Sequence, residues 1–163
     1  MMLARGLATA IVVAILDQLS KAAVLAFFAE RGFGDRETVT SFFNLSLTYN
    51  RGISFGLFNG AAGMGALVFS LAAAAIVAVL IYWLSRVSSP FLAVAIGLII
   101  GGAFGNAIDR LTYGAVMDFV HFHVGSFSWY VFNVADSAIV VGVAGLFYAS
   151  FTGEDAGRAA SQS

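Results

Sequence analysis

The stretch NAIDRLTYGAVMDF, residues 106–119, decides how this chain is interpreted. It begins at the end of residues 87–108, a run without a single charged side chain, and then brings Asp109, Arg110 and Asp118 close to a membrane boundary. A charged side chain at the centre of a spanning helix costs roughly 2.5–3.5 kcal/mol on insertion scales. Charges kept in such a place therefore indicate structural or functional work.

The composition of the chain indicates an integral membrane protein. Of its 163 residues, 60% are hydrophobic and 10% are charged, and the mean hydropathy is +0.92. Soluble domains are nearer to about 45–50% apolar and about 25% charged. The length predicts one domain over residues 1–163. A net charge of −1 without a basic run argues against nucleic acid as a partner, and the absence of cysteine excludes disulfides, thiolate metal sites and a cysteine nucleophile.

Four stretches are long and apolar enough to cross a hydrocarbon core, which takes roughly 20 residues of helix. They cover about residues 7–28, 61–84, 90–108 and 130–151. The first follows Arg5 as a secretory signal peptide would, but polar residues interrupt it and no cleavage motif follows, so we expect an uncleaved helix. Within it Asp17 and Lys21 are four residues apart, share a face and can form a pair.

Two longer connections, residues 30–60 and 112–129, are rich in aromatic and alternating residues, which predicts strands. An even number of spans separates them, so both lie on one side of the membrane, with aromatics at the interface. The expected fold class is an all-α membrane protein with four transmembrane helices and a small β-rich extracytoplasmic platform. The arginines do not orient it. The tail, residues 152–163, is expected to be mobile.

Small residues recur every four positions in the last two spans, at Gly97, Gly101 and Gly105 and again at Ala138 and Gly142. This spacing lets helices approach closely. We therefore expect the third and fourth spans to pack through these faces and to meet near Asn106 and Asn133.

The acidic residues in or near the spans outnumber the cations there, which are Lys21 and Arg110. If the third and fourth spans pack together, Asp118 and Asp136 could meet near the outer surface. Two carboxyl groups that share a proton provide one base and one acid at neutral pH, as in aspartic peptidases. From spacing alone, acids of an ion pathway and structural pairs remain alternatives.

Five motifs in order resemble the lipoprotein signal peptidase family, also called signal peptidase II. They are LDQLSK (16–21), YNRGISFG (49–56), GGAFGNAIDRL (101–111), GAVMDFV (114–120) and FNVADSAIVVG (132–142). The match runs from the first span to the last and leaves out the second span and the tails. The second motif departs from the more usual N-x-G-A-A-F, with Ile53 and Ser54 at the two small positions.

The resemblance implies a bacterial inner-membrane aspartic peptidase with both termini in the cytoplasm and its active site toward the periplasm. It would remove the signal peptide of a prolipoprotein just before a diacylglyceryl-modified cysteine, with Asp118 and Asp136 as the catalytic pair. It assigns no metal or cofactor, implies inhibition by the cyclic depsipeptide globomycin, and is compatible with a monomer embedded in membrane lipid. The positions that it assigns to substrate binding or site support are Asp17, Asn50, Asn106, Arg110 and Asn133, while Asp109 is expected to be structural.

Other functions compete with this reading. GISFG, residues 52–56, has the G-x-S-x-G pattern of serine hydrolases, with His121 or His123 as a possible base. The same two histidines could form half of a metal site, although interfacial histidines are the simpler interpretation. Membrane acids also serve transporters and channels, which would show flux in liposomes and no cleavage.

Overall fold

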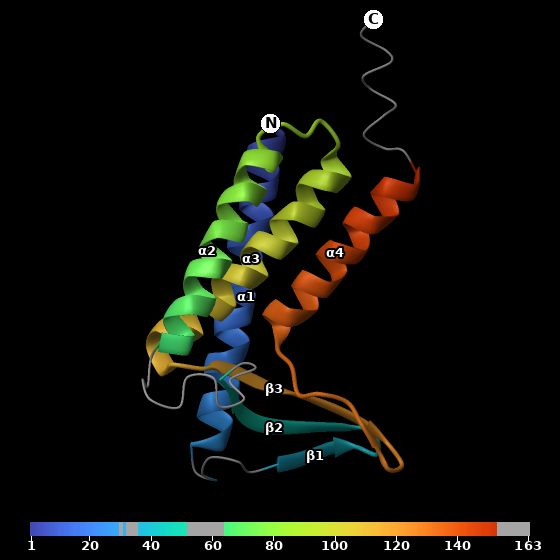
Figure 1. The fold of residues 1–163 in the computed structure, drawn as a ribbon. Coiled ribbons are helices and arrows are strands. Elements are labelled where there is room, and N and C mark those ends of the chain that lie inside the picture. Colours follow the sequence, from blue (N-terminus) through green and yellow to red (C-terminus); the bar gives the residue numbers. More distant parts are fainter. Residues whose placement is uncertain (30, 32–35, 52–63, 153–163) are drawn as a thin grey trace, which may run out of the picture.

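The computed structural model describes residues 1–29, 31, 36–51 and 64–152, with backbone only for 64–69. The serine-hydrolase pattern at 52–56 and the tail from 153 lie outside these residues. Helices and strands follow in the order α1 (Met2–Phe28), β1 (Arg36–Thr40), β2 (Phe43–Asn50), α2 (Met64–Leu84), α3 (Pro90–Tyr113), β3 (Val116–Val124), β4 (Phe127–Ser128) and α4 (Val134–Thr152). The helices form a bundle with the sheet at one end (Figure 1).

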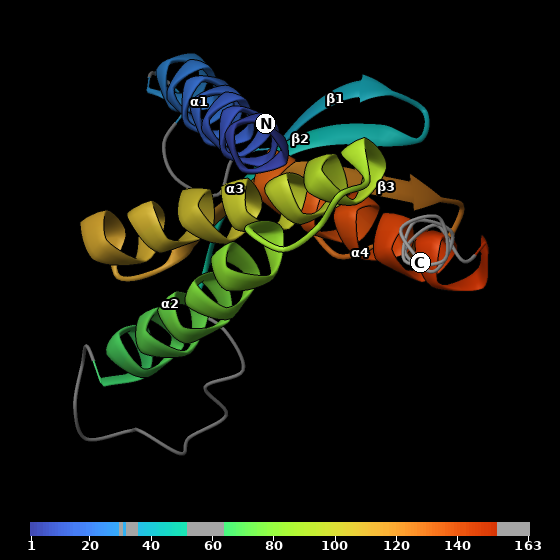
Figure 2. The ribbon, with the colours of Figure 1, turned by 90° about the horizontal axis from the view of Figure 1, so that it is seen from above.

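Helix α3 lies at the centre of the bundle and contacts α1, α2 and α4 (Figure 2). Its glycine face does not have the neighbour that the sequence suggested. A Cβ atom at Gly97 would overlap the carbonyl oxygen of Gly6, and one at Gly101 would lie 2.6 Å from the carbonyl oxygen of Ala10. Both of these carbonyls belong to α1, so the expectation that this face packs on the fourth span is wrong. Spacing defines a face, but not which helix covers it.

Helices α3 and α4 do meet, through a different glycine of α3. A Cβ at Gly102 would overlap the carbonyl oxygen of Ala135, and one at Gly142 of α4 would lie 2.6 Å from the carbonyl oxygen of Ala95. The expectation for Gly142 is thus confirmed. Backbone contacts this close bring the sheet ends of the two helices together.

Substitution Gly102→Ala is expected to destabilise the protein by about 1–3 kcal/mol, the usual cost of overpacking. The added methyl group would meet backbone atoms of Ala135, which cannot move without shifting α4. Thermal unfolding of the purified protein in detergent measures the effect. The control is Gly145→Ala, whose Cβ would meet side-chain atoms and no backbone, the nearest being the Cβ of Ala95 at 3.1 Å. Equal melting temperatures for the two variants would contradict the assigned contact.

The limits of α3 follow from its end residues. Ser89 caps the start, where its hydroxyl oxygen accepts a hydrogen bond from the N–H of Leu92 at 3.3 Å, and Pro90 occupies the first turn. At the other end Gly114, with φ of 70°, donates its N–H to the carbonyl of Arg110. The helix therefore continues to Tyr113, beyond the predicted end at residue 108. The turn expected at Gly114 is confirmed.

Three of the described helices are long and apolar enough to cross a membrane, namely Met2–Phe28, Pro90–Tyr113 and Val134–Thr152. Of α2, the part described with side chains, Ser70–Leu84, is apolar but shorter. A four-span fold therefore stays a prediction. The outward side chains of Leu19, Val79 and Phe147 are each more than 60% exposed. Apolar surface of this extent is suited to lipid rather than water.

The predicted strands are confirmed. They form one antiparallel sheet of order β1-β2-β3-β4 among the described residues. The lower end of α1 packs on this sheet, because Val24 and Phe28 join Leu47, Met117 and Phe119 in one buried cluster. The sheet is therefore fixed to the bundle by an apolar core, and strand β3 lies directly against the helices.

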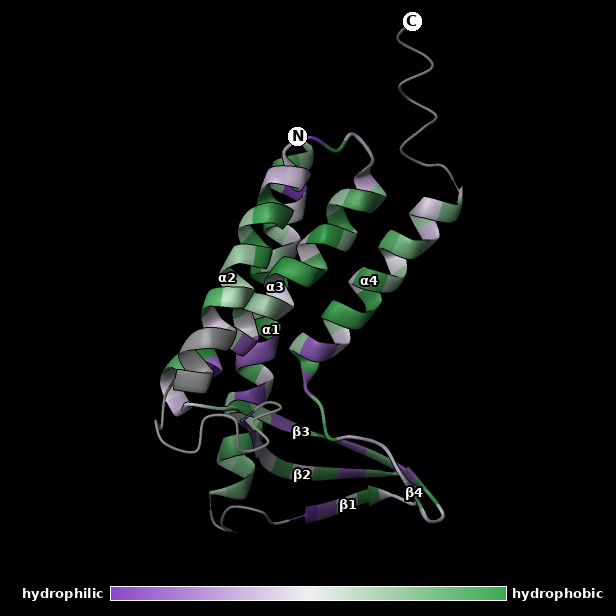
Figure 3. Cartoon of the chain, in the orientation of Figure 1, coloured by the Kyte–Doolittle hydropathy of each residue, from purple (hydrophilic) through white to green (hydrophobic). Residues whose placement is uncertain are grey.

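Hydropathy along the fold separates the two ends of the bundle (Figure 3). The helices are largely hydrophobic, but hydrophilic bands cross α1 and the start of α4 close to the sheet. The start of α1, the α2–α3 turn and the end of α4 lie at the opposite end. Polar groups inside the bundle thus gather near the sheet.

Candidate active site

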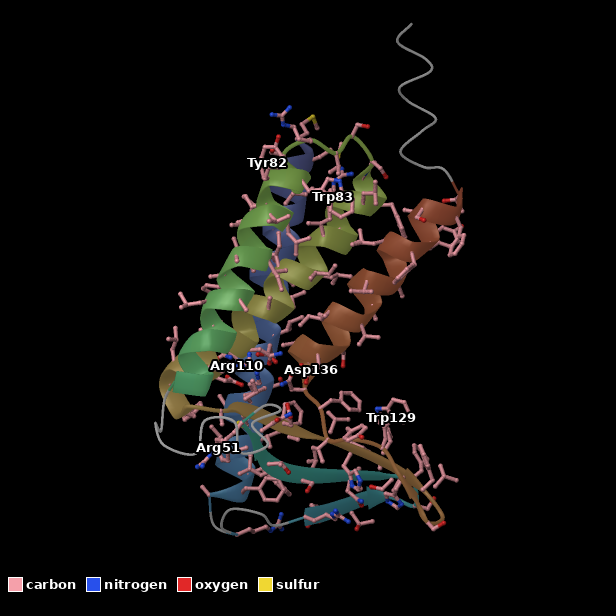
Figure 4. The ribbon with its side chains drawn as sticks, in the orientation of Figure 1. Arg51, Tyr82, Trp83, Arg110, Trp129 and Asp136 are labelled. Carbon is pink, nitrogen blue, oxygen red and sulfur yellow. The ribbon has the colours of Figure 1, made fainter. Side chains whose placement is uncertain are left out.

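The candidate site lies where the end of α3, the start of α4 and strand β3 meet. Asp118 is on β3, directly after the turn at Gly114, and only 2% of its surface is exposed. Asp136 is in the first turn of α4 and is half-buried. Figure 4 shows Asp136 and Arg110 at the sheet end of the helices, with Arg51 on the side of the sheet.

The start of α4 is held by a reciprocal cap. The Oδ1 atom of Asn133 accepts a hydrogen bond from the backbone N–H of Asp136 at 2.8 Å. In return the Oδ2 atom of Asp136 accepts one from the backbone N–H of Asn133 at 3.3 Å. This is a capping box with Asn and Asp in place of the usual Ser or Thr and Glu. It fixes the Asp136 carboxyl group at the positive end of the helix dipole.

Asn133 also holds the second carboxyl group. Its side chain is fully buried, and its Nδ2 atom lies 2.8 Å from Oδ1 of Asp118, 3.1 Å from Oδ1 of Asn106 and 3.2 Å from the carbonyl oxygen of Met117. Asn106 in turn donates from Nδ2 to Oδ1 of Asp136 at 2.8 Å. One amide therefore links both aspartates, and the second amide closes the network.

Strand β2 completes the surroundings of Asp118. Asn50, at the end of this strand, donates from Nδ2 to Oδ2 of Asp118 at 3.1 Å. The register of the sheet explains this contact, because Asn50 pairs with Val116 and Thr48 pairs with Asp118. Both carboxylate oxygens of Asp118 thus accept an amide hydrogen bond.

The electrostatic environment of Asp118 favours its protonated form. Burial, and after it the nearby charge of Asp136, raise the pKa of this carboxyl group to about 7. Hydrogen bonds from Asn50 and Asn133 and the positive charge of Lys21 act in the opposite direction. Asp118 can therefore carry a proton close to neutral pH, as one member of an acid–base pair of carboxyl groups must.

Arg110 lies beside this network at the end of α3. Its Nη1 atom donates to the carbonyl oxygen of Asn106 at 3.3 Å, and its side chain is half-buried. The guanidinium group is planar, carries five donors and keeps its positive charge at any physiological pH.

A separate ionic cluster lies deeper, between α1 and α3. The Nζ atom of Lys21 is 2.7 Å from Oδ2 of Asp17 and 2.6 Å from Oδ2 of Asp109. The pairing of Asp17 with Lys21 is thus confirmed, while the structural role expected of Asp109 stays a prediction.

The structure divides the predicted site residues into two groups. Direct hydrogen bonds join five of them in one network, namely Asn50, Asn106, Asp118, Asn133 and Asp136. Arg110 flanks this network, whereas Asp17 belongs to the Lys21 cluster. Sequence reasoning missed the bond between Lys21 and Asp109. It also missed the cap, for which the spacing N-x-x-D before an apolar helix was an available signal.

One of the two histidines of β3, His121, has hydrogen-bond partners within the sheet. His121 is buried, with its Nε2 atom 2.6 Å from Oγ of Ser128 and its Nδ1 atom 3.3 Å from Nδ2 of Asn44. Within the described ranges, no group of three or more potential ligands is placed to hold a metal ion.

Apolar helices of spanning length, with linked carboxyl groups at one end, are the features of a membrane-embedded hydrolase. The sequence profile of the family described as Signal peptidase (SPase) II matches residues 9–152. The chain belongs to the signal peptidase II family, and it is therefore a peptidase.

Curated relatives extend this match over most of the chain. A lipoprotein signal peptidase from Rhodopseudomonas palustris (strain TIE-1) is 48% identical, with 94% of this chain and 96% of the relative covered. One from Methylobacterium sp. (strain 4-46) is 44% identical, with 95% and 93% covered. A solved structure described as a bacterial membrane enzyme is 29% identical, with a TM-score of 0.76 over 88% of this chain and 90% of that one.

Proposed function

We propose that this protein removes the signal peptide from prolipoproteins and cleaves just before a diacylglyceryl-modified cysteine. The observation that carries this proposal is the network in which Asn133 links Asp118 and Asp136 at the sheet end of apolar helices. Family membership supplies the substrate class. The pair supplies the chemistry, which needs no group beyond these side chains and water.

Hydrolysis follows from the single proton that the two aspartates share. The ionised carboxylate takes a proton from a water molecule while the oxygen of that water attacks the scissile carbonyl carbon. The protonated carboxyl group gives its proton to the carbonyl oxygen, which forms a tetrahedral diol. When the C–N bond breaks, the leaving nitrogen takes a proton from the first carboxyl group. The second carboxylate takes a proton back from a hydroxyl group of the diol, which becomes the carbonyl of the product acid. Asp118 is the proton donor in this scheme because burial and the charge of Asp136 raise its pKa.

The amides around the pair keep its oxygens in place during these transfers. Asn106, Asn133 and Asn50 donate to the carboxylates and do not themselves exchange protons. Arg110, whose charged and planar guanidinium group lies beside the pair, binds carbonyl or ester oxygens of the lipidated substrate.

The membrane setting follows from the same assignment. The protein is a single domain with four spans in the bacterial inner membrane, both termini in the cytoplasm and the sheet toward the periplasm. Two structural features support this arrangement, namely the gathering of polar groups at the sheet end and the location of the start of α1 and the end of α4 at the other. A substrate whose acyl chains stay in hydrocarbon enters sideways between the spans. A monomer is the expected oligomeric state.

A gel-shift assay with purified protein tests the function. A diacylglyceryl-modified precursor is expected to lose its signal peptide, while the unlipidated precursor stays intact, and globomycin is expected to block the reaction. Equal cleavage of both precursors would overturn the proposed specificity. Flux in liposomes without any cleavage would favour a transporter.

The pH dependence of kcat/KM is expected to show an alkaline limb near pH 7, the value to which the pKa of Asp118 is raised in the free protein. As the pH rises through this value the shared proton is lost, and kcat/KM falls up to tenfold per pH unit. Kinetics with a lipidated precursor from about pH 5 to pH 9 measure the limb.

The variant Asn50→Ala checks the assignment of this limb. It removes a hydrogen bond that lowers the pKa of Asp118, so the limb should move to higher pH. An unmoved limb would show that another group controls the high-pH loss.

A further inference from the structure

Lys21 is a buried cation that the proposed chemistry does not use. Only 3% of its surface is exposed, and its Nζ atom contacts carboxylate oxygens of Asp17, at 2.7 Å, and Asp109, at 2.6 Å. Gln18 closes the cluster, with its Nε2 atom 3.1 Å from Oδ1 of Asp109 and 3.2 Å from Oδ2 of Asp17. Gly105 leaves room for it, because a Cβ there would lie 2.6 Å from Oδ2 of Asp17.

The two carboxyl groups bound to Lys21 also bind backbone next to the catalytic pair. Oδ1 of Asp17 accepts a hydrogen bond from the N–H of Ala135 at 3.0 Å, and Ala135 directly precedes Asp136. Oδ2 of Asp109 accepts one from the N–H of Met117 at 3.0 Å, and Met117 directly precedes Asp118. The same cation thus connects to the chain immediately before each aspartate.

We propose that Lys21 is a positioning residue that sets the distance and orientation between the two aspartates. This inference rests on the proposed function of Asp118 and Asp136. Lys21 touches neither residue and acts through Asp17 on one and through Asp109 on the other. Since α1 carries both Lys21 and Asp17, helix α1 becomes part of the catalytic framework without contributing a group that contacts substrate.

The charge of Lys21 also reaches the pair, where it lowers the pKa of the Asp118 carboxyl group against the larger effects of burial and of Asp136. The charged groups around the cluster come from each packed element: Asp17 and Lys21 from α1, Asp109 and Arg110 from α3, Asp118 from β3 and Asp136 from α4. Removing the cation therefore raises the pKa of Asp118. A merely structural role for Lys21 predicts no such change.

The test compares Lys21→Gln, which removes the charge, with Lys21→Arg, which keeps it. We expect Lys21→Gln to lower kcat roughly 10- to 100-fold with little change in KM, because misplaced groups slow the chemical step more than binding. The alkaline limb of kcat/KM should move to higher pH. Lys21→Arg should keep the limb at its parental position and recover most of the rate.

Loss of folding is separated from loss of positioning by two further variants. The double variant Lys21→Gln/Asp109→Asn removes one positive and one negative charge, so the net charge of the cluster is unchanged. It is used in place of Lys21→Gln if the single variant does not fold. Val13→Ala removes buried packing from α1 outside the cluster and serves as a matched control for general instability. It should lower the melting temperature without moving the alkaline limb.

A readout independent of cleavage keeps this inference distinct from the proposed function. Infrared difference titration follows the carboxyl group of Asp118, with Asp118→Asn to assign its band. An upward shift of the Asp118 titration in folded Lys21→Gln supports the inference. If the parent protein cleaves no precursor, that result overturns the proposed function but leaves this inference standing. A parental titration, or parental kcat and pH dependence, in folded Lys21→Gln would overturn the inference.

Discussion

Asp118→Asn and Asp136→Asn are each expected to lower kcat for a lipidated precursor by at least about 10³-fold, within the range for loss of a general acid or base. An amide can neither take a proton from water nor give one to the scissile carbonyl oxygen. Asparagine has nearly the same shape as aspartate and keeps an oxygen that can accept the bonds from Asn133 or Asn106. Both variants should therefore fold, and single-turnover cleavage by the purified proteins measures the loss.

The control for these variants is Glu37→Gln. Glu37 lies on the sheet, where its exposed carboxylate is 3.6 Å from Arg31. Exposed ion pairs of this kind contribute little to stability, and Glu37 is not in the network of the two aspartates. This variant should therefore cleave at the parental rate. Near-parental activity of either aspartate variant would refute the assignment of the pair.

Asn133→Ala is expected to have the next largest effect, a loss of about 10²- to 10³-fold in kcat, as found when one preorganised donor is removed from an active site. The variant leaves Oδ1 of Asp118 without its 2.8 Å donor and the N–H of Asp136 without its acceptor. Stability should fall by about 0.5–2 kcal/mol from the lost cap.

Two measurements check this prediction. Because the bond from Asn133 lowers the pKa of Asp118, its loss should move the alkaline limb of kcat/KM to higher pH. The matched control is Asn44→Ala, which removes an equally buried asparagine that bonds His121 in the sheet. A similar loss of kcat in both variants would point to general destabilisation rather than to the pair.

Local features of the fold could be predicted from the sequence because their causes are local. Pro90 starts a helix, Gly114 adopts positive φ to end it, and alternating residues form the strands. Asp17 and Lys21 are placed on one face by helical geometry alone.

Contacts between elements could not be predicted in the same way. The spacing of Gly97 and Gly101 indicates a face that accepts close approach, yet any neighbouring helix could fill it, and α1 does. The bond between Lys21 and Asp109 could not be predicted for the same reason, because it forms only when α1 lies against that face of α3. The candidate site was foreseen by motif, whereas the hydrogen bonds that arrange it required the packing of α3, α4 and β3.

The double use of Asn133 bears on how this enzyme could escape an inhibitor. An inhibitor that binds the two aspartates depends on side chains that Asn133 holds in place, and Asn133 also caps the start of α4. Mutations that disturb this contact would harm folding and turnover together, so such mutants would be lost from a population. Resistance should therefore arise at positions that border the substrate and contribute nothing to the cap.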